Sequence, residues 1–160
     1  MTFVLTSSAF NDGDTLPDAH VKALGDVSPP LAWSGAPEGT RSFAVTCYDP
    51  DAPTGSGFWH WTVANIPADV TALPQNAGAV GGANLPSGAV QGRTDYGDVG
   101  FGGAEPPAGH GPHRYVFTVF AVDVDALPVG PDNSGAIFGF NLHFHTLARA
   151  SITAVYEDRG

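Results

Sequence analysis

The sequence predicts an all-β protein, built as a sandwich of antiparallel strands. Three segments rich in β-branched and aromatic residues alternate their side chains with the period of two that a strand requires. The 21 glycines and 14 prolines are spread between apolar runs, so they indicate many turns and many short elements. A helical pattern is found in a single segment, which favours the all-β class over an α/β fold.

Two long strands are expected in the first half of the chain. Arg41–Tyr48 alternates as a strand buried mostly on one face does. Phe58–Ala64 places Trp59 and Trp61 on one face and the intervening His60 on the other. The alternation therefore predicts that His60 points away from the tryptophans.

The longest predicted strand is Arg114–Val122, in the second half of the chain. His113 and Tyr115 have the same parity in this segment, so both side chains are expected to project from one side of the sheet. Shorter strands are expected at Phe3–Thr6, Leu31–Trp33 and Ala148–Tyr156.

One segment, from Ser134 to Leu147, has two competing periods. Its apolar residues alternate as in a strand, and a partly different set of its residues forms a helical stripe. The period alone does not decide between helix and strand. On a strand, His143 and His145 would share one face and form a possible metal pair, whereas on a helix they diverge.

Length and charge limit the function classes that remain. The 160 residues are expected to form one domain, 1–160, with no internal repeat or linker, and such a domain buries about 70% of its unfolded surface. There are 6 Lys and Arg against 16 Asp and Glu, so the field around the protein is negative. Such a field repels phosphate backbones, and nucleic acid is not an expected partner.

The start of the chain and its cysteine content favour a cytoplasmic protein. The first ten residues lack the features of a secretory signal, and no apolar run approaches the length of a membrane span. Cys47 is the single cysteine, so no internal disulfide is possible, which fits a reducing compartment. Its position in a strand indicates a small buried hydrophobic residue and not a nucleophile.

A first polar cluster is expected where the strand Arg41–Tyr48 ends. Asp49 and Asp51 follow it directly, and the prolines that alternate with them fix the backbone, so the two carboxylates are rigidly held. The returning strand is expected to bring His60 beside one of them, where a carboxylate would orient the imidazole and favour its charged form. A stiff structural turn is the alternative, since Asp and Pro are common turn formers.

A second polar cluster spans Glu105 to Tyr115. Two prolines, Pro106 and Pro107, and several glycines precede His113 and Tyr115, which are two hydrogen-bond donors aimed one way. The structural alternative is that His113 caps the strand edge and Tyr115 belongs to the core. The intervening His110, set between glycines, is expected to be a solvated loop residue.

No standard catalytic or cofactor signature is present in the sequence. There is no nucleophile elbow, no phosphate-binding loop and no complete dinucleotide fingerprint, so no catalytic residue and no cofactor are expected. Zinc-type ligand spacing is also absent, so no metal is expected. The long glycine-rich stretch from Asn76 to Gly103 is expected to be functional, because loops of that length in compact domains usually are.

Taken in order, the motifs of the two clusters resemble the phosphatidylethanolamine-binding protein (PEBP) family, in particular its bacterial branch of Raf kinase inhibitor-like proteins. The resemblance covers Ser28 to Tyr156 and rests on Asp49-Pro-Asp-Ala-Pro53, Phe58-Trp-His-Trp with Asn65-Ile-Pro, Pro106-Pro107 and Gly111-Pro-His-Arg-Tyr115. It implies a PEBP-like antiparallel β-sandwich with one or two short helices. It also implies a helix from Ser134 to His145, which removes the metal pair.

The resemblance further implies a small pocket for phosphate-like anions or phospholipid head groups of the phosphatidylethanolamine type. Carried over motif by motif, the ligand-binding residues are Asp49, His60, Pro106, His113 and Tyr115, with Asp51 and Pro107 beside them. The histidines and the tyrosine are expected to donate hydrogen bonds to phosphate oxygens, and Asp49 to orient an imidazole or to accept from a head-group ammonium.

The function expected from this resemblance is that of a binding protein and not of an enzyme. A kinase or a protease that the protein modulates is expected as a possible protein partner. The chain ends soon after Tyr156, without the C-terminal helix that helps to cover the pocket in animal members, and a homodimer is expected to cover it instead. The rival hypotheses are a phosphoester or ester hydrolase using Asp49 and His60, and an interaction protein with a vestigial pocket.

Overall fold

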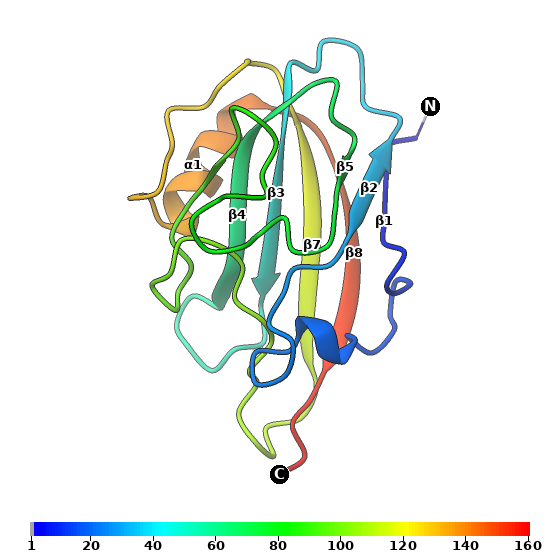
Figure 1. Ribbon diagram of the computed structural model, residues 1–160, viewed down its shortest axis with the longest axis vertical. Helices are drawn as coiled ribbons and strands as arrows, with labels where there is room; N and C mark the ends of the chain where they lie inside the picture. Colours follow the sequence, from blue (N-terminus) through cyan, green and yellow to red (C-terminus); the bar gives the residue numbers. More distant parts are fainter. Residues whose placement is uncertain (1) are drawn as a thin grey trace.

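A five-stranded antiparallel sheet forms the centre of the computed structural model, which describes residues 2–160 (Figure 1). Each strand is antiparallel to its neighbours, and the order across the sheet is β6-β4-β3-β7-β8. The bounds are Ser42–Asp49 (β3), Phe58–Pro67 (β4), Val90–Gln91 (β6), His113–Val122 (β7) and Thr146–Tyr156 (β8). All the long strands that the sequence predicts are present.

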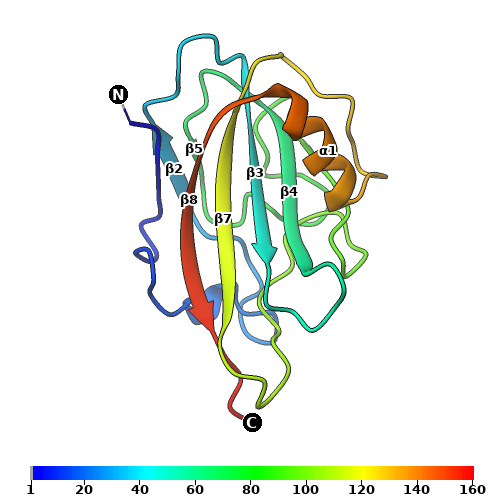
Figure 2. The ribbon, with the colours of Figure 1, turned by 180° about the vertical axis from the view of Figure 1, so that it is seen from behind.

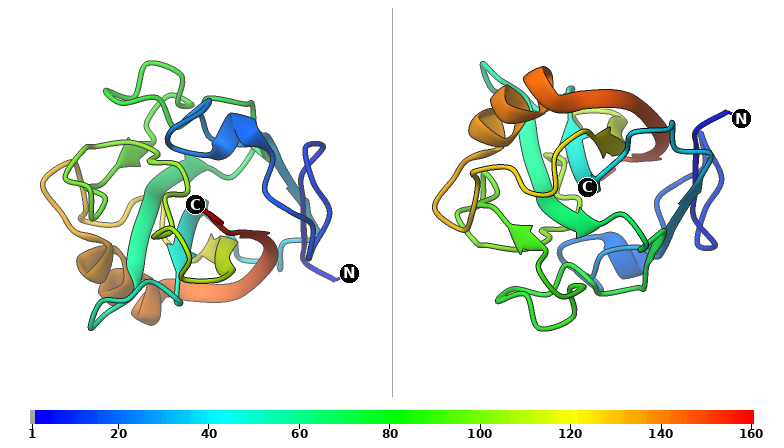
Figure 3. Two further views of the ribbon diagram at one scale, coloured as in Figure 1. Left: turned by 90° about the horizontal axis from the view of Figure 1, so that it is seen from below. Right: turned by 90° about the horizontal axis from the view of Figure 1, so that it is seen from above.

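A smaller sheet and the long loops cover one face of this central sheet, and a helix covers part of the other (Figures 2 and 3). The smaller sheet has the order β1-β2-β5, and the two helical elements are a single 3-10 turn, η1, and the helix α1. The bounds are Val4–Thr6 (β1), Asp18–His20 (η1), Leu31–Ser34 (β2), Ala72–Leu73 (β5) and Gly135–His145 (α1). The predicted antiparallel β-sandwich with one or two short helices is confirmed.

Two apolar clusters hold these layers together. The larger cluster lies between the sheets, where alternate residues of β3 and β7 such as Cys47, Phe117 and Val119 are almost fully buried. The smaller cluster lies under α1, where Phe120 of β7 contacts the helix layer. Adjacent residues of β7 therefore face opposite layers, as the period of a strand requires.

The helix α1 resolves the segment in which two periods compete. Ser134 caps its first turn, since the Ser134 side chain accepts a hydrogen bond from the backbone N–H of Ile137. Phe138 and Leu142, four residues apart, are buried against the sheet, and this helical spacing decides the fold of the segment. The helix implied by the family resemblance is confirmed, and α1 has 11 residues. Within residues 2–160, no helix is long and apolar enough to cross a membrane.

A bulge in β4 changes the predicted direction of one tryptophan. Cys47 pairs with Trp61 and Tyr48 pairs with Trp59, so His60 is an extra residue in β4. Trp59 therefore lies on the helix side, against the first glycine of α1, and Trp61 lies in the core between the sheets. The prediction that both tryptophans share a face opposite His60 is wrong for Trp61, because strict alternation stops at the bulge.

Candidate functional site

The ends of three neighbouring strands, at one end of the central sheet, form a cavity of about 180 Å³. Because β4 and β7 flank β3 and run antiparallel to it, the last residue of β3, Asp49, lies beside the first residues of β4 and β7. The cavity is lined by residues from these strand ends and from the adjoining loops, namely Asp49, Ala52, Pro53, Thr54, Phe58, His60, Tyr96, Glu105, Pro106, Pro107, His113 and Tyr115. Six of the seven residues that the sequence singles out are in this set.

A buried carboxylate and a buried imidazole that line the cavity are hydrogen-bonded to each other. Asp49 Oδ2 accepts a hydrogen bond from His113 Nδ1 at 2.7 Å, and both residues are at most 2% exposed. The other oxygen, Oδ1, accepts from the backbone N–H of Asp51 at 2.7 Å. Both oxygens of Asp49 are therefore engaged, and the role of the carboxylate is to fix the orientation and tautomer of His113.

His60 has a different partner from the one that the sequence suggests. Its Nδ1 donates to the backbone carbonyl of Gly102 at 2.8 Å, and not to Asp49 or Asp51. Burial lowers the pKa of His60 from the ordinary value of 6.5, which outweighs the opposing effects of the Gly102 carbonyl and of the Asp49 charge. His60 is therefore a neutral imidazole whose Nε2 presents a lone pair, so it is an acceptor and not the predicted donor.

Asp51 lies beside the cavity, is not among its lining residues, and binds Arg114 at the start of β7. Its carboxylate accepts three hydrogen bonds from Arg114, from Nε at 2.9 Å, from Nη2 at 2.8 Å and from the backbone N–H at 2.9 Å. These bonds hold the pKa of Asp51 at about 2, below its ordinary value of 3.8. Asp51 thus ties the loop after β3 to the start of β7, and its carboxylate is occupied by this contact.

Tyr115 supplies a polar atom that the fold leaves without a partner. The residue is 1% exposed, and its hydroxyl makes no hydrogen bond to any part of residues 2–160. Burial, together with the Asp49 charge, raises the pKa of Tyr115 far above its ordinary value, so the hydroxyl keeps its proton and acts as a donor. A buried hydroxyl without a partner costs about 1 to 3 kcal/mol, which a ligand in the cavity would recover.

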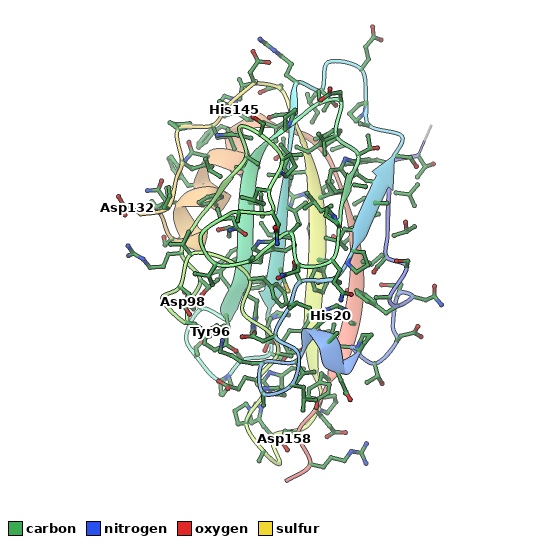
Figure 4. All side chains as sticks on the ribbon, in the orientation of Figure 1. His20, Tyr96, Asp98, Asp132, His145 and Asp158 are labelled. Atoms are coloured by element: carbon green, nitrogen blue, oxygen red, sulfur yellow. The ribbon has the colours of Figure 1, made fainter. Side chains whose placement is uncertain are left out.

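Three aromatic residues of the site were not predicted to belong to it. Phe58 and Tyr96 pack against His60, with ring centroids 4.9 and 5.5 Å away, and the Tyr96 hydroxyl donates to the Gly103 carbonyl. Tyr96 lies at the pocket end of the molecule and His145 at the opposite end (Figure 4). The length of the glycine-rich stretch from Asn76 to Gly103 predicts that the stretch is functional, but no pattern within it identifies Tyr96 as a site residue. The third residue is His110, which is exposed but bonded to His113, with His110 Nδ1 2.7 Å from His113 Nε2.

The part of the chain that the structure describes contains no side-chain cluster that could bind a metal ion. Among residues 2–160 there is no group of three or more His, Cys, Asp or Glu residues that could hold a metal ion. His145 Nδ1 instead contacts Asp123 Oδ1 at 2.9 Å, and His143 lies beside Phe144 on the exposed side of α1. The two histidines near the end of the helix therefore do not act as a pair.

The fold and the site define a β-sandwich protein with a small, partly polar pocket at one end of its main sheet. A family model described as phosphatidylethanolamine-binding protein matches residues 6–157. The chain therefore belongs to the phosphatidylethanolamine-binding protein family.

Bacterial relatives support this assignment along nearly the whole chain. The chain is 54% identical to the UPF0098 protein YbcL of Escherichia coli K12 over 160 residues, covering 97% of this chain and 87% of the relative. It is also 54% identical to the UPF0098 protein YbhB of the same organism, covering 96% of this chain and 99% of YbhB.

Solved structures show the same fold. The crystal structure of E. coli YbcL, described as a new member of the mammalian PEBP family, matches with a TM-score of 0.95 and covers 97% of this chain and 98% of that one. A PEBP homologue from Chlamydia trachomatis, CT736, matches with a TM-score of 0.82 at 28% identity, covering 98% of this chain and 97% of that one.

Proposed function

We propose that this protein binds a small phosphate-bearing head group, with phosphoethanolamine as the type, in the cavity at the end of β3, β4 and β7. The observation that carries the proposal is the Tyr115 hydroxyl, a buried donor that has no partner within residues 2–160 and lies on the cavity wall. Buried polar groups in native proteins are nearly always paired, so an unpaired one in a cavity indicates a ligand.

The polar groups of the cavity match a phosphate that carries one proton. The Tyr115 hydroxyl donates to a phosphate oxygen, and the neutral His60 accepts from a P–OH group. A phosphomonoester gains that proton as the pH falls through about 6. Affinity is therefore expected to fall as the pH rises above neutrality, because the dianion has no proton to offer His60.

Charge and size favour a zwitterionic head group over a bare anion or a whole lipid. The chain carries a formal net charge of −10, and the exposed carboxylate of Glu105 lies at the cavity, where an ammonium group would complement it. The cavity of about 180 Å³ is small beside the ~300 to 1,000 Å³ of usual ligand pockets. It has room for a head group and not for acyl chains.

Binding without turnover is the proposed activity. The rival hydrolase requires Asp49 and His60 to work as an acid and base pair, but Asp49 is bonded to His113, and His60 to Gly102. An assay for phosphate release from a phosphomonoester tests this directly, and sustained release by the protein would favour the hydrolase. Modulation of a kinase or protease and the assembly of a homodimer stay predictions of the family resemblance, and a cytoplasmic location stays a prediction of the sequence.

Calorimetric titration tests the proposed ligand. Phosphoethanolamine is expected to bind at one site per chain, and more tightly than either ethanolamine or inorganic phosphate. Glu105→Gln is the matched variant: it should weaken phosphoethanolamine by about twofold to fivefold, as expected of an exposed charge pair, and should leave inorganic phosphate equal or tighter. No heat and no competition from any of the three compounds at millimolar concentration would contradict the proposal.

A further inference from the structure

Both ring nitrogens of His113 are engaged by protein atoms. Nδ1 donates to Asp49, and Nε2 lies 2.7 Å from Nδ1 of His110, whose ring centroid is 4.9 Å from that of His113. His113 is 1% exposed, whereas His110 is exposed on the loop that leads into β7. While the contact with His110 exists, Nε2 of His113 is not available to a ligand atom.

The contact between the two imidazoles limits the number of protons that the pair can carry. Because Asp49 accepts from Nδ1 of His113, that nitrogen carries a proton. Only one hydrogen can lie between His113 Nε2 and His110 Nδ1, donated from either side. When both rings are cations, each of the facing nitrogens carries a hydrogen and the contact breaks. It therefore exists with no extra proton or with one, but not with two.

The loop that carries His110 has glycine on both sides of this residue. Gly109 has a φ of 74° and Gly111 a φ of 91°, in the left-handed region that glycine adopts without strain, and a Cβ at either would meet nothing within 4 Å. Pro107 and Pro112 stand outside this short segment and have fixed φ angles. The backbone N–H of Gly109 donates to the Asp158 carbonyl at 2.8 Å and that of His110 to the Pro107 carbonyl at 3.1 Å, so the start of this turn is held. The His110 ring can therefore leave His113 by rotation of its side chain and of the backbone at Gly111, with the rest of the loop in place.

We propose that His110 is a latch on the pocket: it occupies His113 Nε2 in the empty protein, and the phosphate group must displace it in order to bind. The proposal rests on the proposed function, since it names the regulation of that same site. Acid opens the latch, because the second proton on the pair breaks the contact and leaves His113 Nε2–H free to donate to the phosphate.

The groups that face the pair set the range of pH in which this happens. Three carboxylates lie near the pair: Asp49 at the end of β3 is bonded to His113, Asp51 follows it, and Glu105 lines the cavity. His60 on β4 is neutral, and Tyr115 on β7 keeps its proton. Tyr156 of β8 is the strand partner of His113, and Arg114 forms an ion pair with Asp51.

Removal of the latch gives the first test. On the alkaline side of neutral, His110→Ala should bind phosphoethanolamine about 3- to 10-fold more tightly than the unaltered protein, because no molecule of the variant has His113 Nε2 occupied by His110. The difference should shrink as the pH is lowered and the second proton binds to the pair. His143→Ala, which removes an exposed histidine of α1, is the matched control and should bind as the unaltered protein does. Equal or weaker binding by His110→Ala at the higher pH would overturn the latch.

The second test needs no ligand and separates the latch from the proposed function. Nitrogen-15 NMR of the histidine rings should show a protonated His113 Nδ1 throughout, and the amide signals of Gly109 and Gly111 should shift together as the second proton binds to the pair. Glycine signals that stay fixed across the titration would overturn the latch. If phosphoethanolamine binds to no form of the protein while the glycines do shift, the ligand assignment fails and the pH-opened contact stands.

Discussion

The Tyr115 hydroxyl is expected to lower the stability of the empty protein and to raise its affinity for phosphate. Tyr115→Phe removes one oxygen and keeps the buried ring, so packing against His60 at a centroid distance of 5.2 Å is preserved. A buried hydroxyl without a partner costs about 1 to 3 kcal/mol, so the free energy of unfolding should rise by about 1 kcal/mol in the variant. For a chain of this size, that corresponds to an increase in Tm of about 2 to 4 °C.

The same substitution should weaken ligand binding. A hydrogen bond to a charged group contributes about 1.5 to 3 kcal/mol, so the dissociation constant for phosphoethanolamine should rise by about 10- to 100-fold. Calorimetric titration measures the expected loss of affinity, and thermal unfolding of the same preparation measures the expected gain in stability. Tyr48→Phe is the control, since the Tyr48 hydroxyl already donates to the Ser56 carbonyl and its loss should not stabilise the fold.

Two results would refute this reasoning about Tyr115. Destabilisation of the empty protein by more than about 1 kcal/mol would mean that the hydroxyl has a native partner. Unchanged affinity with an intact fold would mean that the hydroxyl does not contact the ligand.

Three further predictions concern the wall of the pocket and the absence of a metal. His113→Ala should destabilise the fold by about 3 to 5 kcal/mol in chemical denaturation, because it leaves the buried carboxylate of Asp49 without its hydrogen-bonded partner. Arg114→Ala should lower the free energy of unfolding only slightly near neutral pH, since its ion pair with Asp51 is exposed to solvent. That cost should vanish as the pH falls from about 4 through about 2, because the lowered pKa of Asp51 stabilises the fold only while the carboxylate is ionised. A chelator should leave Tm unchanged, and a fall in Tm with release of stoichiometric zinc would contradict the metal-free account.

The sequence predicts the strands of the central sheet well because their patterns are local. The alternation of β7 places His113 and Tyr115 on one side, and both line the cavity. The direction of Trp61 is not predictable in the same way, because the bulge at His60 arises from pairing with β3 and leaves no mark in the residues of β4.

The polar partners of the site are harder to predict than its members. Asp49 and His60 are predicted as neighbours because they lie before and after the same turn, yet the carboxylate bonds to His113, which is 64 residues away in the chain. The Gly102 carbonyl that fixes His60 is a backbone atom, and the sequence carries no signal for its position. The glycines that flank His110 predict an exposed loop residue, and the residue is exposed, but the same glycines also permit the turn that brings its ring to His113.

A crystal structure of the protein grown with phosphoethanolamine tests the central claim most directly. The account predicts one head group in the cavity, with a phosphate oxygen about 2.6 to 3.0 Å from the Tyr115 hydroxyl and another within hydrogen-bond distance of His60 Nε2. The ammonium group should lie toward Glu105, and the His110 ring should have left His113. An empty cavity at saturating ligand, or a head group bound elsewhere while Tyr115 stays unpartnered, would contradict it.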